Sequence, residues 1–181
     1  YTPMQLKKAY GVQVEKEKQA VAKNHPNFTD IDIRIEKVFE DLLKNKGVEP
    51  PADFGKYTAK AFRAISTKYI KLYDGVLDLL DSLKRAGKNV YLLTNAQRWF
   101  TVPELKMLGI EDKFDGIVIS SDEYTCKPDK AFYNIILDRY NLNPKETIMI
   151  GNDCETDVLG SYNAGLDSLY IHSNISPEVS I

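Results

Sequence analysis

At 181 residues, with 43% apolar and 28% charged side chains, the chain is long enough for one sizeable core with a small accessory unit. A formal net charge of −2 lacks the basic excess typical of nucleic-acid binding, and every apolar run is shorter than the roughly 20 residues of a membrane span. Two cysteines, Cys126 and Cys154, are too few for a disulfide scaffold and no signal-peptide pattern is present, so we expect a cytoplasmic protein with no membrane or nucleic-acid partner.

Residues 1–71 show helical periodicity and no strand-like alternation. The clearest helix is predicted to begin near Thr29, which would cap it, with Asp30 and Asp32 in its first turn. Its apolar positions recur at helical spacing, at Ile35, Val38, Phe39, Leu42 and Leu43. A proline pair at 50–51 ends this pattern and a second helical pattern follows. We therefore expect an all-helical unit over residues 1–71.

Strands and helices alternate in residues 72–181. Short apolar strands are predicted at 90–94, 116–120, 147–150 and 168–171. Helices are predicted at 76–83, 103–108 and 157–164, and a further helix is predicted to be capped by Asp129. This alternation predicts an α/β fold in which a parallel sheet is covered by helices on both faces.

Polar side chains follow three of these strands, and in parallel sheets ligands bind beyond the carboxyl ends of the strands. Thr94-Asn95 follows the first strand, Ser120-Ser121-Asp122 the second and Asn152-Asp153 the third. Taken alone, Thr94-Asn95 is better explained as a turn or helix cap, and Lys127 as a solvated surface lysine. Asp153 and Asp157, spaced four apart, would repel on one helix face unless a cation or a lysine lies between them.

The order of these motifs is more specific than any one of them. It resembles the haloacid dehalogenase-like (HAD) hydrolase superfamily in four stretches, at 72–77, 92–95, 126–132 and 148–153. The resemblance covers residues 72–172 and implies a three-layer Rossmann-like core over 72–181. Residues 1–71 are similar to the small helical cap that such enzymes carry.

The resemblance also implies roles for individual residues. Thr94 would bind the transferring phosphoryl group with Asn95 beside it, and Lys127 would neutralise its oxygens. Asp153 would be a ligand of Mg²⁺, and Asp157 would hold Lys127 or a metal-bound water. The implied activity is Mg²⁺-dependent hydrolysis of a small phosphorylated metabolite by positioning and charge neutralisation.

One departure from the family pattern lies in the metal-binding motif, because many members place the first Asp directly after the Gly, where this chain has Asn152. We favour Asp153 as the ligand, since an ionised carboxylate suits Mg²⁺ better than an amide.

A second departure is an absence: no strand of this sequence ends in the Asp-x-Asp motif that ends the family's first strand. The first Asp of that motif forms an aspartyl-phosphate and the second is the general acid/base. Asp30-Ile31-Asp32 has the same spacing, but no apolar strand precedes it and a predicted helix follows. We therefore expect the motif on a strand that precedes Tyr1. Without that central strand, the strands at 90–94 and 147–150 should remain unpaired with each other.

Three alternatives remain open. A relative could use the same nucleophile on a carbon–halogen or carbon–phosphorus bond, or act as a phosphomutase, although the retained Asp153 and Asp157 favour metal-dependent phosphoryl chemistry. A non-catalytic module could keep the fold for binding alone. Neither the substrate nor the oligomeric state follows from the sequence.

Overall fold

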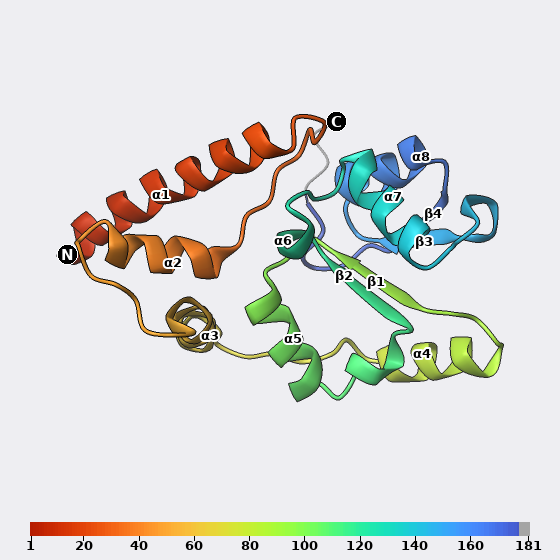
Figure 1. Cartoon of the computed structure of the whole chain (residues 1–181). Coiled ribbons are helices and arrows are strands. Elements are labelled where there is room, and N and C mark those ends of the chain that lie inside the picture. Colours follow the sequence, from red (N-terminus) through yellow and green to blue (C-terminus); the bar gives the residue numbers. More distant parts are fainter. Residues whose placement is uncertain (178–181) are drawn as a thin grey trace.

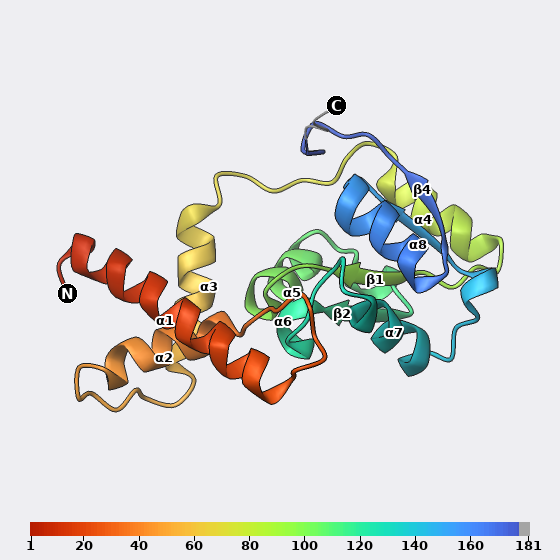
Figure 2. The ribbon, with the colours of Figure 1, turned by 90° about the horizontal axis from the view of Figure 1, so that it is seen from above.

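The first part of the chain is helical in the computed structural model, which describes residues 1–177 (Figure 1). It contains α1 (Pro3–Asn24), α2 (Ile35–Lys44) and α3 (Phe54–Ser66). A cluster of buried residues holds α1 against α2, formed by Val21, Ile33, Val38 and Leu42. Figures 1 and 2 place these three helices to one side of the strands. Within the described residues, no helix is both long and apolar enough to span a membrane.

The helix predicted to begin near Thr29 begins later, so that predicted start is wrong. α2 begins at Ile35, and the residues before it are extended because their backbone groups bond elsewhere in the chain. The Asp32 N–H donates to the Tyr124 carbonyl and the Cys126 N–H to the Asp30 carbonyl, each at 3.1 Å. Thr29 therefore caps no helix, and Asp30 and Asp32 do not lie in a first helical turn.

The second part alternates between helices and strands, which confirms the predicted α/β class. Its longer helices are α4 (Val76–Arg85), α5 (Arg98–Met107) and α7 (Lys130–Arg139), with the short α6 (Ser120–Glu123) and α8 (Gly160–Ala164). Its strands are β1 (Tyr91–Thr94), β2 (Gly116–Ile119), β3 (Ile148–Gly151) and β4 (Asp167–Tyr170). Two helix predictions need correction. α5 begins at Arg98 rather than Pro103, and a π-helical turn, Cys154–Leu159, replaces the start of the helix expected at 157–164.

Helices cover both faces of the β1–β2 pair, as expected for a three-layer fold. β1 and β2 run parallel with Thr94 opposite Ile119. Leu93 and Val118 pack against α7 and α8, whereas their neighbours Leu92 and Ile117 pack toward α4 and α5. This alternation follows from the two-residue period of a strand.

The strands form two separate parallel pairs, β1–β2 and β3–β4. Within residues 1–177, no backbone hydrogen bond joins β1 to β3, as the sequence led us to expect. One face of the β3–β4 pair is also uncovered: Ile148 and Leu169 are 54% and 50% exposed. The described residues therefore leave the middle of the sheet open between β1 and β3.

Candidate active site

A buried ion pair lies at the carboxyl ends of the strands. The Lys127 ammonium donates to Oδ1 of Asp157, and the two side chains are only 10% and 6% exposed. Oδ2 of Asp157 accepts the backbone N–H groups of Asn152 and Asp153, at 3.0 and 3.1 Å. Both carboxylate oxygens are thus used, one to hold the lysine and one to shape residues 151–157, which we call the acidic loop.

A glycine at the end of β3 lets this carboxylate approach the backbone. A Cβ atom at Gly151 would lie 2.2 Å from Oδ2 of Asp157, a separation that real Cβ atoms do not show. The strand can therefore end against the carboxylate only with glycine at this position.

Tyr133 of α7 is hydrogen bonded to the acidic loop. Its hydroxyl donates to the Thr156 carbonyl inside the π-helical turn, and its side chain is fully buried. Burial raises the pKa of Tyr133, and the charges of Asp157 and Asp153 raise it further, so the hydroxyl remains a donor. Gly160 makes room for the ring, since a Cβ there would lie 3.0 Å from ring atoms of Tyr133.

Asp153 has one carboxylate oxygen free for a ligand. Its Oδ1 caps the π-helical turn by accepting the N–H groups of Glu155 and Thr156, both at 2.9 Å. Its Oδ2 has no hydrogen-bond partner among residues 1–177. The neighbouring Asn152 amide lies 3.4 Å from the Ser173 hydroxyl instead.

Asn95 holds the backbone on either side of Lys127. Its side-chain oxygen accepts the Lys127 N–H at 2.8 Å, and its amide donates to the Lys127 carbonyl at 2.9 Å. This two-point contact fixes the loop that carries the lysine at the end of β1. Thr94, half-buried, precedes Asn95, and its hydroxyl has no hydrogen-bond partner in the described part of the chain. The residues predicted for the site therefore lie together beyond the carboxyl ends of β1 and β3.

These residues do not form a metal site by themselves. Within residues 1–177, no group of three or more His, Cys, Asp or Glu side chains is arranged to hold an ion. Mg²⁺ needs near-octahedral oxygen coordination, and among the residues predicted for the site only Asp153 has a carboxylate oxygen without a hydrogen-bond partner. The donor type fits Mg²⁺, but the number of donors is too small for a complete site.

The thiol next to Lys127 is not suited to nucleophilic attack. Burial and, to a smaller extent, the nearby carboxylates of Asp32, Asp30 and Asp129 raise the pKa of Cys126 to about 11. The thiolate is the nucleophilic form of cysteine, so Cys126 is inert at neutral pH.

Sequence reasoning missed a polar network that joins the helical part to the site. Gln97 accepts the Ile35 N–H at 2.9 Å and donates to Asp32 and to the Ile33 carbonyl, at 3.2 and 2.9 Å. The buried Ser120 hydroxyl donates to the other Asp32 oxygen. Burial raises the pKa of Asp32, and the Ser120 hydroxyl offsets only part of that rise. The partners lie more than 60 residues apart in sequence, so no local pattern could indicate them.

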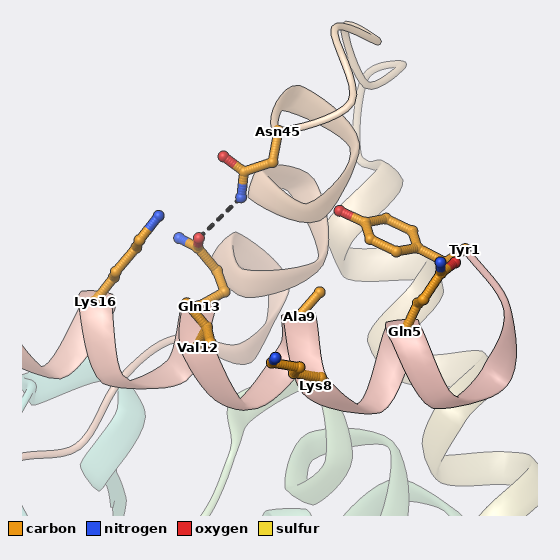
Figure 3. Close-up of a pocket in the computed structure, with 8 residues that line it drawn as sticks. All are labelled: Tyr1, Gln5, Lys8, Ala9, Val12, Gln13, Lys16 and Asn45. Atoms are coloured by element: carbon orange, nitrogen blue, oxygen red, sulfur yellow. Dashed lines mark hydrogen bonds between the residues drawn. The ribbon is translucent and has the colours of Figure 1, made fainter.

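A separate groove lies on the helical part, between α1 and the end of α2 (Figure 3). Its volume is about 470 Å³, and Gln13 and Asn45 are hydrogen bonded across it at 3.0 Å. None of the residues predicted for the site lines this groove. It lies near the N-terminal end of α1, which Figure 1 shows on the far side from β3 and β4.

Comparisons with known proteins support one family. A profile described as haloacid dehalogenase-like hydrolase matches residues 7–171. The HAD-hydrolase YfnB of Bacillus subtilis is 29% identical over 142 residues, which are 78% of this chain and 59% of the relative. The pyrimidine 5′-nucleotidase PynA of Streptococcus pneumoniae is 29% identical over 133 residues, 73% of this chain and 55% of PynA. The chain thus spans under three fifths of the length of these curated relatives.

Solved structures agree in fold. The structure of YfnB, described as bound to magnesium and as revealing interdomain movement, matches with a TM-score of 0.60 and 25% identity over 94% of this chain and 74% of that chain. A 2-haloacid dehalogenase from Pseudomonas syringae has the same TM-score of 0.60 over 87% of this chain and 67% of its own. Its 17% identity supports a shared fold alone.

Proposed function

Because the chain belongs to the haloacid dehalogenase-like hydrolase family, we propose that it forms the larger part of a Mg²⁺-dependent phosphatase. The substrate would be the phosphate monoester of a small metabolite. The observation that carries this proposal is the buried pair of Lys127 and Asp157, fastened to Asn95 on one side and to the acidic loop on the other. A fixed cation at the end of a parallel sheet is suited to neutralising phosphoryl oxygens.

Some of these residues would bind the phosphoryl group, and others orient the residues that bind it. Lys127 and the free hydroxyl of Thr94 would donate to the phosphoryl oxygens. Asp157 holds and directs the lysine, and Asn95 fixes the backbone around it. When bound, Mg²⁺ would supply charge neutralisation at the phosphoryl group, with Asp153 as one of its ligands.

The attacking group belongs to a part of the site beyond these residues. We place the nucleophilic Asp, which would form the aspartyl-phosphate, and the acid/base Asp on a further strand between β1 and β3. The open sheet supports this placement, because β1 and β3 are not joined and unpaired strand edges are costly. We further propose that residues 1–71 form the cap and 72–181 the core, and that the protein works in the cytoplasm.

The test is hydrolysis of p-nitrophenyl phosphate, with and without Mg²⁺, by protein whose verified intact mass includes this further strand. Lys127→Met should lower kcat/KM by about 100-fold, the usual effect of removing a preorganised charge contact. Lys130→Met is the matched control, because Lys130 is exposed and lies on the same loop–helix junction, so its kcat/KM should stay unchanged. No turnover by the wild-type protein would favour the non-catalytic binding module instead.

A further inference from the structure

One segment of the helical part is bonded along the loop that carries Lys127. Residues 29–35, here called the strap, are the second half of the connection between α1 and α2 together with the first residue of α2, and they pass beside α6 (Figure 1). Ile31 and Thr125 form an antiparallel bridge, flanked by the two backbone hydrogen bonds from Asp32 to Tyr124 and from Cys126 to Asp30. The strap therefore pairs directly with residues 124–126, immediately before Lys127.

Asp129 is the side chain that fastens the two segments together. Its Oδ1 caps α7 by accepting the Ala131 N–H at 2.8 Å. Its Oδ2 accepts the Thr29 and Asp30 N–H groups at 2.7 and 3.3 Å, and the Thr125 hydroxyl at 3.2 Å. An N-cap needs only the first of these contacts. The second oxygen thus serves the strap, about 100 residues away in the chain.

The environment of Asp129 keeps this contact strong. The residue is only 5% exposed. Burial alone would raise the pKa of Asp129, but the N–H groups of Ala131, Thr29 and Asp30 outweigh it and hold that pKa below its ordinary value. The carboxylate is therefore ionised at neutral pH, and hydrogen bonds to a buried ionised group are about twice as strong as neutral ones.

Lys127 lies two residues before Asp129 and so links the contact with the strap to the rest of the candidate site. Asn95 and Asp157 hold it from the β1 side and the acidic-loop side, as described above. The strap, through Asp129, holds the same loop from the side of the helical part. A shift of about 1 Å in a positioned charge can cost about 100-fold in rate, so the third contact matters for an enzyme that depends on Lys127.

We propose that Asp129 is a positioning residue, through which docking of the strap sets the placement of Lys127 for phosphoryl binding. The inference rests on the proposed phosphatase function for its kinetic consequence, but not for its structural one. Undocking of the strap would release residues 124–127 on one side and leave Lys127 held by Asn95 and Asp157 alone.

Asp129→Asn separates the two tasks of this carboxylate. Asn is as good an N-cap as Asp and keeps an oxygen for the Ala131 N–H, but its amide nitrogen replaces the acceptor that the strap uses. The matched control is Asp115→Asn, since Asp115 also accepts a backbone N–H, that of Val90 at 2.7 Å. Asp115 directly precedes β2, at the opposite end of the strands from Thr94.

Two measurements test the proposal in the full protein. In hydrogen–deuterium exchange, Asp129→Asn should speed exchange at least tenfold in peptides that cover 29–35 and 124–128, and Asp115→Asn should leave both unchanged. With p-nitrophenyl phosphate, Asp129→Asn should lower kcat/KM at least tenfold in the wild-type background. In the Lys127→Met background the same change should have less than a twofold effect, because the residue acts through Lys127.

Three results would overturn the inference. Exchange at 124–128 that stays at the wild-type rate while the strap is released would show that the strap does not hold the lysine loop. An equal loss of kcat/KM in both backgrounds, or the same loss in Asp115→Asn, would show a general structural effect. If the wild-type protein has no turnover, the proposed function fails, and the exchange rates still decide whether Asp129 couples the two segments.

Discussion

The buried ion pair of Lys127 and Asp157 makes a quantitative prediction about stability. Both side chains are at least nine-tenths buried, so removing one partner leaves an uncompensated charge with little solvent to screen it. Breaking a buried pair in this way costs about 3–5 kcal/mol. We expect Asp157→Asn and Lys127→Met each to lower the free energy of unfolding by about that amount.

The double variant separates the charge effect from packing. With both charges removed, no buried ion remains unpaired, and the amide oxygen introduced by Asp157→Asn can still accept an N–H of the acidic loop. The double variant should therefore lose less stability than either single variant, giving a coupling energy of about 3 kcal/mol or more. Urea unfolding followed by the fluorescence of Trp99, the sole tryptophan, measures all four proteins.

An exposed pair serves as the control for this cycle. Arg139 and Glu123 are 2.8 Å apart, with side chains 41% and 18% exposed. Surface pairs contribute about 0–1 kcal/mol, so Arg139→Met and Glu123→Gln should be nearly neutral and additive. Equally small and additive effects at Lys127 and Asp157 would refute the buried pair.

Three further predictions concern the acidic loop and the strap. Gly151→Ala should destabilise the protein by more than about 2 kcal/mol, because its Cβ would lie 2.2 Å from Asp157. Gly11→Ala is the control and should not destabilise the protein, because a Cβ there would meet nothing within 4 Å. Equal melting temperatures for the two variants would contradict the close approach. Asp153→Ala should abolish the rise in melting temperature that Mg²⁺ gives the wild-type protein, since a ligand that binds only the folded state stabilises it; an unchanged rise would place the ion elsewhere. The raised pKa of Asp32 means that the folded state keeps a proton that the unfolded state has lost, so stability falls as pH rises from the ordinary carboxyl pKa through the higher folded value. Asp32→Asn should therefore gain stability relative to wild type across that pH window in urea titrations, and a pH-independent difference would exclude the effect.

The alternation of strands and helices after residue 72 was predictable because it depends on local patterns. Apolar runs such as 90–94 and glycine ends such as Gly165 are set by neighbouring residues, and the structure keeps them within one or two positions. The helix capped by Asp129 was predicted for the same reason, and its Oδ1 makes the expected contact with Ala131.

The strap could not be predicted, because its partners are distant in sequence. Thr29 looks like a helix cap, yet its N–H donates to Asp129 and the helix starts six residues later. The side chains that decide this are Gln97, which precedes α5 after β1, and Ser120, which begins α6 directly after β2. Tertiary hydrogen bonds here outweigh local capping preference.

In the candidate site, the resemblance to a known family named the residues, and the geometry divided their tasks. Asn95 was expected beside the phosphoryl group, but both polar atoms of its side chain bond the Lys127 backbone. The resemblance implies that Asp157 holds either Lys127 or a metal-bound water, and its two oxygens are occupied by Lys127 and by loop N–H groups. The role of Asp153 as a metal ligand stays a prediction.

The measurement that tests the central claim most directly compares phosphate release from a panel of phosphate monoesters with chloride release from 2-chloropropionate. Both reactions should be followed with and without Mg²⁺, in the wild-type protein and in Lys127→Met. The proposed function predicts release of phosphate alone, dependent on Mg²⁺ and lowered about 100-fold in the variant. Chloride release, or phosphate release that depends on neither Mg²⁺ nor Lys127, would contradict it.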